Sequence, residues 1–224
     1  MFFALARRTW RGRRIRQRPC NIIRQPYTIS SAQARELDEI VKEFPEGGLS
    51  KAGIRVLKAD QAQWVRKGRD TQAKILKEGG STALEAYTAA TRLRADELPG
   101  IARRIFLQDR PDGPQGYYVR RENGRETGWL SVRWTDKKAG EVSVDAEAIL
   151  VLRPDNVRSG LWSGGGAVQK GVLKAPDEEG EGSATFTFKG DRVQVATTSD
   201  FASGSMGMGV TIEGTYVRQG LPKL

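Results

Sequence analysis

The hydrophobic pattern of the chain changes its period near the middle, and this change constrains the fold more than any other feature of the sequence. Between residues 31 and 98, apolar residues recur three and four positions apart, as they do along one face of a helix. From residue 116 onward they alternate with polar residues and are often β-branched or aromatic, as in half-buried strands. This order predicts an α+β protein, with an N-terminal helical hairpin or three-helix unit followed by a small antiparallel β-barrel or sandwich.

The helical part, residues 31–99, is expected to contain three helices. We expect the first over 31–44, the second over 50–78 and the third over 82–98. The signals at their ends are serine caps at Ser30 or Ser31 and at Ser50, a break at Gly79 and Gly80, a capping box of Thr82 with Glu85, and a stop at Pro99-Gly100. The charged residues that we interpret as partners in ion pairs between the helices are Asp60, Arg69, Asp70, Arg92 and Arg94.

The β part is expected over residues 116–218, after a linker over 100–115 and before a tail over 219–224. The Lys-Gly-Asp-Arg sequence at 189–192 lies between two alternating apolar stretches and predicts a hairpin turn. The glycine-rich stretch 163–167 is similar to a phosphate-binding loop, but it lacks the lysine and the following helix that such a loop needs. We therefore interpret this stretch as a β-turn or bulge.

Positive charge is concentrated at the N-terminus. Residues 1–35 contain nine arginines and no acidic residue. Subtracting these nine from the 37 basic residues leaves 28 against 27 acidic residues, a net charge of +1 for residues 36–224. A surface for nucleic acid is therefore expected only in the N-terminal segment, residues 1–30. The residues expected to contact RNA or a partner protein there are Arg7, Arg8, Trp10, Arg11, Arg13, Arg14, Arg16 and Arg18.

The chain contains no histidine and a single cysteine, Cys20. No disulfide can form within the chain, and zinc or haem sites, which need histidine or several cysteines, are not expected. Catalysis by Ser-His-Asp or Cys-His groups is excluded, and no paired set of carboxylates stands out for acid–base chemistry. We therefore expect no cofactor, no metal and no enzymatic activity. No apolar run of about 18 residues is present, so no transmembrane helix is expected.

Three interpretations of residues 1–30 stay open. An organelle-import sequence is rich in arginine, poor in acids and amphipathic, and a membrane potential favours the entry of its charges. An arm that binds ribosomal or other RNA would pair its arginines with phosphates and stack Trp10 on a base. A basic tail without a specific partner is the third. The arginine content fits mitochondrial import best, which predicts a location in the matrix or at the inner membrane.

Two stretches of the helical part, 57–70 and 91–98, resemble the LprI-type lysozyme-inhibitor domain of the bacterial envelope. The residues that carry the resemblance are Leu57, Gln61, Trp64, Arg69, Asp70, Arg92 and Leu98. The β part resembles a small β domain that often follows it. The resemblance implies a helical unit that packs around these residues. Because such envelope proteins carry paired cysteines and this chain has none after Cys20, it also implies an inherited scaffold with a changed role.

These features lead to four functional hypotheses. The first is a non-enzymatic accessory or structural subunit of a mitochondrial inner-membrane complex, of the respiratory chain or the ATP synthase. Such a subunit would lie peripheral to the membrane and contact other protein subunits, which suits a nearly neutral body. The second is a mitochondrial ribosomal protein that binds rRNA through its N-terminal arm. The third is a lysozyme-inhibitor-like envelope protein, and the fourth is an enzyme that relies on carboxylates.

Overall fold

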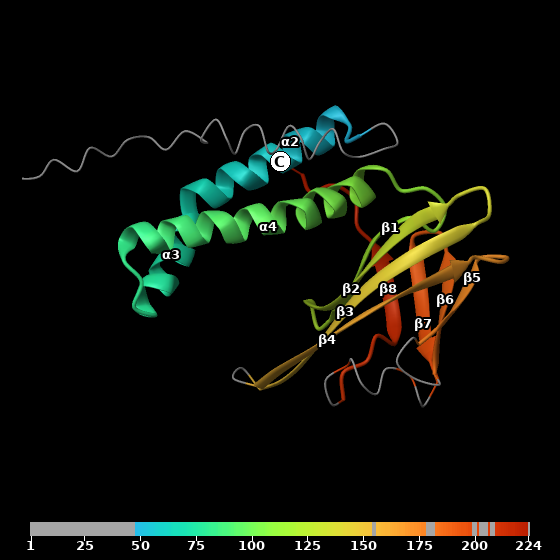
Figure 1. Ribbon diagram of the computed structural model, residues 1–224. Coiled ribbons are helices and arrows are strands. Elements are labelled where there is room, and N and C mark those ends of the chain that lie inside the picture. Colours follow the sequence, from blue (N-terminus) through green and yellow to red (C-terminus); the bar gives the residue numbers. More distant parts are fainter. Residues whose placement is uncertain are drawn as a thin grey trace, which may run out of the picture.

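The computed structural model describes residues 48–153, 156–177, 182–198, 201, 206 and 209–223. The residues of the predicted N-terminal arm, which lie outside this part, are Arg7, Arg8, Trp10, Arg11, Arg13, Arg14, Arg16 and Arg18, and the helix expected over 31–44 lies outside it too. A hairpin of helices stands beside a strongly curved antiparallel sheet (Figure 1). The predicted α+β order is therefore confirmed. In the described part, no helix is long and apolar enough to cross a membrane.

The first arm of the helical hairpin runs from α2 (Lys51–Gln63) through a π-helical turn, η1 (Trp64–Gly68), into α3 (Arg69–Glu78). Ser50 caps α2 as predicted, because its Oγ accepts hydrogen bonds from two backbone N–H groups in the first turn. The π-helical turn depends on its glycine: a Cβ added at Gly68 would lie 2.6 Å from Cδ1 of the Trp64 ring. The glycine thus lets the indole lie flat against the helix backbone.

The second arm is α4 (Ala83–Asp109), which starts with the predicted capping box of Thr82 and Glu85. The predicted stop at Pro99-Gly100 is wrong, because the helix continues through the proline and residues 100–109 are helix rather than linker. A proline inside a helix removes one backbone hydrogen bond and costs about 3 kcal/mol. Burial of the apolar face beyond the proline, which includes Ile105 and Leu107, offsets this cost.

The two arms pack through an apolar cluster. Leu57 of α2 and Leu98 of α4, which both carry the resemblance, are buried in this cluster together with Ile105. The open end of the hairpin is joined by Asp109 at the end of α4. Its carboxylate accepts hydrogen bonds from the Ser50 backbone N–H (2.6 Å) and hydroxyl (2.7 Å). The helix cap of α2 is therefore held directly by the last residue of α4.

Eight antiparallel strands form one sheet in the order β4-β3-β2-β1-β8-β7-β6-β5. Their bounds are β1 (Gly116–Glu122), β2 (Arg125–Asp136), β3 (Glu141–Arg153), β4 (Asn156–Ala167), β5 (Val172–Pro176), β6 (Ser183–Lys189), β7 (Arg192–Thr197) and β8 (Gly214–Arg218). Two meanders are joined by the pairing of β1 with β8, and the end strands β4 and β5 approach each other. The sheet thus forms a nearly closed barrel (Figure 1). The hairpin turn predicted at 189–192 joins β6 to β7.

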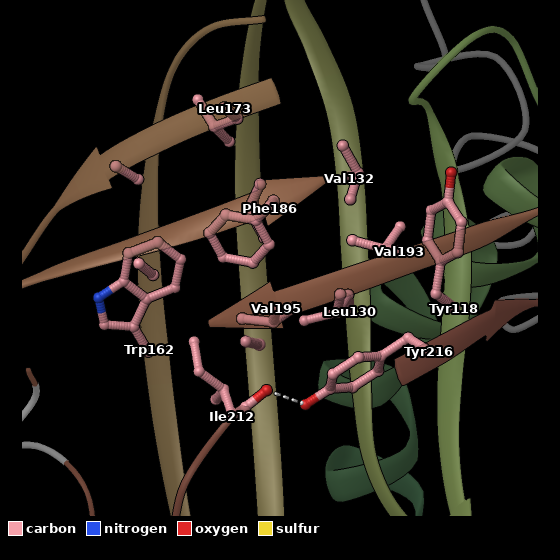
Figure 2. Packing of buried hydrophobic residues seen from close by; sticks show 14 of the residues in the cluster. Tyr118, Leu130, Val132, Trp162, Leu173, Phe186, Val193, Val195, Ile212 and Tyr216 are labelled. Carbon is pink, nitrogen blue, oxygen red and sulfur yellow. Dashed lines mark hydrogen bonds between the residues drawn. The ribbon is translucent and has the colours of Figure 1, made fainter. Parts of the chain in front are cut away.

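The alternation of side chains places one face of each strand inside the barrel. Figure 2 shows how these side chains fill it: the Trp162 ring stacks on Phe186 with 5.6 Å between ring centroids, and the buried Tyr216 hydroxyl donates to the Ile212 carbonyl (2.8 Å). The buried residues of this core are Tyr118, Leu130, Val132, Val142, Val144, Ala146, Ala148, Trp162, Leu173, Ala175, Ala184, Phe186, Val193, Val195, Ile212 and Tyr216. The barrel interior is therefore a packed apolar core.

The glycine-rich stretch 163–167 forms the last part of β4 and pairs with β3, so its interpretation as a turn or bulge is wrong. Its glycines make room for close packing on both sides of the strand. A Cβ at Gly164 would collide with the Trp162 ring, and one at Gly165 would collide with the backbone of Val142 on β3. Close approach of a neighbouring side chain and a neighbouring strand explains these glycines.

The helical hairpin packs on the outer face of the barrel through the C-terminal half of α4. Phe106 and Leu107 of this helix pack with Tyr117 and Val119 of β1 and with Trp129 of β2. Because side chains alternate along β1, these two residues of β1 face the helix while the tyrosine between them faces the barrel interior. The helices and the barrel are thus joined by an apolar contact distinct from the core of either part.

Candidate functional site

A short sequence occurs twice in the two strands that join the halves of the barrel. Both copies read Gly-x-Tyr-Val-Arg, at residues 116–120 in β1 and 214–218 in β8. The strands are antiparallel neighbours, so the tyrosine of each copy meets the arginine of the other. The guanidinium carbon lies 5.6 Å from the opposite ring centroid for Arg120 and 5.1 Å for Arg218. A repeat of five residues with one variable position is too short to stand out in a sequence, and only the strand pairing gives it meaning.

Arg120 closes one end of the barrel. Its guanidinium donates hydrogen bonds to the carbonyl oxygens of Thr211 (3.0 Å) and Glu213, and its Nε donates to the hydroxyl of Thr127 (3.1 Å). Below it, burial raises the pKa of Tyr216 to about 12. The buried guanidinium charge of Arg120 is held by these backbone and hydroxyl oxygens, because a buried charge needs hydrogen-bond partners. These contacts separate the apolar core from the surface at this end.

A hollow of about 540 Å³ lies over this end of the barrel. Arg120 and Glu213 contribute polar groups to its lining, and Ile149 and Leu150 of β3 contribute apolar ones. Glu213 accepts hydrogen bonds from the hydroxyl (2.7 Å) and the backbone N–H (3.0 Å) of Thr197, and these bonds lower the pKa of its carboxyl. The hollow thus has a charged side and an apolar side.

Leu150, which lines the hollow, is followed in β3 by the end of the β3–β4 hairpin, which extends beyond the neighbouring strands (Figure 1). Val151 pairs with Val157 near the tip, and Leu161 lies on the same face of β4. Their side chains are 47 %, 57 % and 62 % exposed. Leu152, on the opposite face, is also exposed. We call Val151, Leu152, Val157 and Leu161 the hairpin end.

Backbone pairing positions the hairpin end. Strand β3 pairs with β2 only as far as Ala148, whereas its pairing with β4 continues to Arg153. The last part of the hairpin is therefore a two-stranded extension of the barrel wall, with both strands hydrogen-bonded to each other. Large apolar side chains that are exposed together on such an ordered element are typical of surfaces where proteins meet.

A second hollow, of about 340 Å³, lies where α4 crosses the barrel. Tyr117 and Trp129 form its floor and stack with ring centroids 6.0 Å apart. Trp129 Nε1 donates to Glu147 (2.6 Å), and Asp145 accepts from Arg133 (3.2 Å). Burial raises the pKa of Tyr117 to about 12. Because these polar groups bond to one another, we assign this hollow to the packing between the two parts of the protein.

The helices bring together part of the set of residues that carries the resemblance. Gln61 Oε1 accepts a hydrogen bond from Arg94 Nε (3.0 Å), and the Arg94 guanidinium carbon lies 5.6 Å from the Trp64 ring centroid. Asp60 forms an ion pair with Arg94, which confirms one of the predicted interhelical pairs. Arg92 is exposed, and Arg94 is the arginine that lies between the helices. A spacing pattern cannot choose between two arginines that stand two positions apart.

Arg69 and Asp70 belong to a neighbouring contact between α3 and α4. The Arg69 guanidinium carbon lies 5.5 Å from the Tyr87 ring centroid, and the Tyr87 hydroxyl donates to Asp70 (3.2 Å). These contacts hold the two arms together near the turn of the hairpin. Within the described residues, no three acidic, histidine or cysteine side chains are arranged to hold a metal ion.

No family model matches the chain, and no curated protein or solved structure matches it. The resemblance to the LprI-type domain therefore stays a prediction that depends on the residues of the helices. The candidate site is defined by its own geometry, as the hairpin end and the hollow beside it.

Proposed function

We propose that the protein is a non-enzymatic binding subunit that docks onto another protein through the hairpin end. The observation that carries this proposal is the joint exposure of Val151, Val157 and Leu161 on one face of paired strands. The hollow at the end of the barrel offers charged groups at Arg120 and Glu213, and its lining includes Leu150, the residue before Val151.

The hairpin end can contribute binding free energy at a small ordering cost. Its strands are already paired, so little backbone entropy is lost when a partner binds. Complete burial of a large apolar side chain contributes about 1.5–3 kcal/mol. Since Val151, Val157 and Leu161 are each about half exposed, their burial would contribute about 3 kcal/mol in total. This is the magnitude expected for the energetic centre of a protein interface.

We further propose that the partner belongs to a mitochondrial inner-membrane complex, of the respiratory chain or the ATP synthase. The support for this host is the arginine-rich, acid-free sequence of residues 1–35. A mitochondrial ribosomal protein that binds rRNA through the same arginines is the second candidate. Recovery of the tagged full chain outside mitochondria would refute both hosts, and co-migration that nuclease treatment abolishes would favour the ribosome.

The docking proposal is tested with the double variant Val157→Thr/Leu161→Thr. Threonine at both positions suits a strand but removes most of the apolar contact. The matched control is Val217→Thr, at an exposed valine of β8 in another part of the barrel. Each tagged full chain is expressed in its native host, gently extracted and fractionated by size. We expect the wild type and the control to co-migrate with a large assembly. The share of the double variant that co-migrates should be at least about tenfold smaller.

Urea unfolding of the purified proteins provides the folding control. The free energies of unfolding should agree within about 0.5 kcal/mol, because the substituted side chains are exposed. Two results contradict the proposal. One is a wild-type protein recovered only as a free monomer, and the other is a double variant that stays in the assembly as well as the Val217→Thr control.

A further inference from the structure

The outer side of the first helical arm carries a row of basic side chains. The exposed lysines and arginines of α2, η1 and α3 are Lys51, Arg55, Lys58, Arg66, Lys67, Lys74 and Lys77. Spacings of three and four residues place such side chains on one side of a helix. The opposite side, with Leu57 and Ala73, is buried. The net charge of +1 for residues 36–224 conceals this local excess, so the expectation of a basic surface only at the N-terminus is incomplete.

The acidic residues in the middle of this arm are engaged with α4. Asp60 pairs with Arg94, and Asp70 accepts a hydrogen bond from Tyr87 (3.2 Å). Among the residues that the structure describes, no ion pair joins the cations of the basic row to an acid. The exposed acids of this arm are Asp70 and Glu78, against seven exposed basic side chains, so the row presents an excess of positive charge that attracts an anionic surface.

The basic row ends at the turn of the helical hairpin, where two large apolar side chains are exposed. Ile75 of α3 is 62 % exposed, and Leu84 in the first turn of α4 is 79 % exposed. Lys74 and Lys77 lie on the same helix as Ile75, within two positions of it. We define the basic tip as six exposed side chains between η1 and the first turn of α4: Arg66, Lys67, Lys74, Ile75, Lys77 and Leu84.

We propose that the basic tip docks on the surface of an anionic lipid bilayer. Lysines and arginines attract acidic headgroups, and each charge near the surface strengthens binding by about fivefold. Ile75 and Leu84 would enter the boundary between the headgroups and the acyl chains, as the apolar residues of interfacial helices do. A nucleic acid would also attract the cations, but its phosphates offer no apolar phase to these two side chains. The combination of charge and apolar exposure therefore favours lipid.

This lipid surface lies on the helical hairpin, whereas the proposed protein-docking surface lies on the β3–β4 hairpin. The two proposals use different residues, so either can fail without the other. A subunit with both surfaces could bind its partner while it contacts the membrane that holds the complex.

Flotation with lipid vesicles tests the inference on the full chain, so the N-terminal arginines are the same in every sample. The vesicles contain phosphatidylcholine alone, or phosphatidylcholine and phosphatidylserine in equal parts. The charge variant is Lys67→Gln/Lys74→Gln/Lys77→Gln. Its matched control, Lys138→Gln/Lys174→Gln/Lys189→Gln, removes the same charge from exposed positions of the barrel. A second variant, Ile75→Gln/Leu84→Gln, removes the apolar contact and keeps the charge.

We expect the wild type to bind the mixed vesicles and the charge variant to bind them at least about tenfold more weakly than its control does. The Ile75→Gln/Leu84→Gln variant should also bind more weakly than the wild type, by about tenfold. Circular dichroism verifies that each variant keeps its helices. Equal binding by the charge variant and its control overturns the inference. So does equal binding of the wild type to both kinds of vesicle, or binding to a short RNA duplex with no binding to either.

Discussion

Gly214, the first residue of β8, allows Arg120 to close the barrel, and its replacement by alanine tests this explanation of the Gly-x-Tyr-Val-Arg repeat. Gly214 has a φ of +130°, a conformation that residues with a side chain rarely adopt. A Cβ added there would also lie 3.0 Å from Cδ of Arg120. Gly214→Ala should therefore strain the backbone and displace the guanidinium from the carbonyl oxygens that it binds.

The second copy of the repeat supplies a matched control. Gly116 is not among the described residues with positive φ, so an alanine there meets crowding but no backbone strain. Its Cβ would lie 3.0 Å from Nε of Arg218, which is only partly buried and can move, and 3.2 Å from Cε2 of the buried Tyr118 ring. The two variants thus make the same chemical change at equivalent positions of the repeat, with backbone strain expected in only one of them.

The structure sets the size of each effect. Backbone strain of this kind costs about 1–3 kcal/mol. Partial loss of the hydrogen bonds of the buried Arg120 adds about 1 kcal/mol, because bonds from a charged donor are each worth about 1.5–3 kcal/mol. We therefore expect Gly214→Ala to lower the free energy of unfolding by about 2–4 kcal/mol. For Gly116→Ala we expect a change within about 1 kcal/mol, because a smaller unfolded-state entropy partly offsets the crowding.

Urea unfolding followed by tryptophan fluorescence and circular dichroism measures both values. The dependence of the free energy on urea concentration should be the same in the two variants, since both unfold the same buried surface. If Gly214→Ala is no less stable than Gly116→Ala, the explanation of the repeat by a glycine-dependent arginine contact is wrong.

Two further predictions concern buried polar side chains. Arg94→Met should lower the free energy of unfolding by about 2–3 kcal/mol, since Gln61 loses its partner and the partly exposed Asp60 loses its ion pair, whereas Arg92→Met at an exposed position should change it by less than about 0.5 kcal/mol. Equal effects in thermal or urea unfolding would show that Arg94 is not the arginine that joins the helices. The second prediction is alkaline destabilisation. Burial raises the pKa of Tyr216 to about 12, above its ordinary value of 10, so the folded state keeps the proton that the unfolded state loses. The stabilisation is thus fully present below pH 10 and is lost as the pH rises toward 12, by at most about 1.4 kcal/mol per pH unit for each such tyrosine. Tyr216→Phe should flatten this decline in urea unfolding measured across that range, and an unchanged slope would count against the role of the tyrosine.

Local signals predicted much of the fold correctly. The serine cap at Ser50, the capping box of Thr82 with Glu85 and the hairpin turn at 189–192 all lie where the sequence places them. Each of these signals acts between residues a few positions apart, so the chain contains the whole interaction in one short window. The alternation of apolar residues after residue 116 likewise identifies strands, because the side chains of a strand alternate whatever its neighbour is.

The course of α4 was missed because a local signal competes with distant contacts. Pro99 and Gly100 weaken a helix by themselves, and the sequence shows only this effect. The apolar face beyond them is buried against α2 and the barrel, and neither partner is near in the sequence. Tertiary packing therefore overcomes the helix-stop signal, and the predicted linker becomes the helix that joins the two parts of the protein.

The candidate site was equally inaccessible to sequence reasoning. Exposed apolar residues such as Val157 and Leu161 look like ordinary strand residues in the sequence, and alternation alone suggests burial. Val157 is exposed because β3 and β4 stay paired beyond Ala148, where the pairing of β3 with β2 ends. Leu161 is exposed because it lies on the face of β4 opposite to the buried Gly160 and Trp162. The basic row on the first helical arm was missed for another reason. The net charge of a chain sums the cations and anions of all its surfaces, so it does not show a local excess of cations.

By itself the sequence determined that helices come first and strands follow, where α2 and α4 begin, and that most of the second half alternates apolar and polar side chains. These properties depend on φ and ψ preferences and on contacts within a few residues. The tertiary structure alone decided that the sheet curls into a nearly closed barrel, that Arg120 and Tyr216 meet, and which apolar side chains remain uncovered. These outcomes depend on pairing between strands about a hundred residues apart, such as Tyr118 with Arg218, and no local preference specifies such a partner.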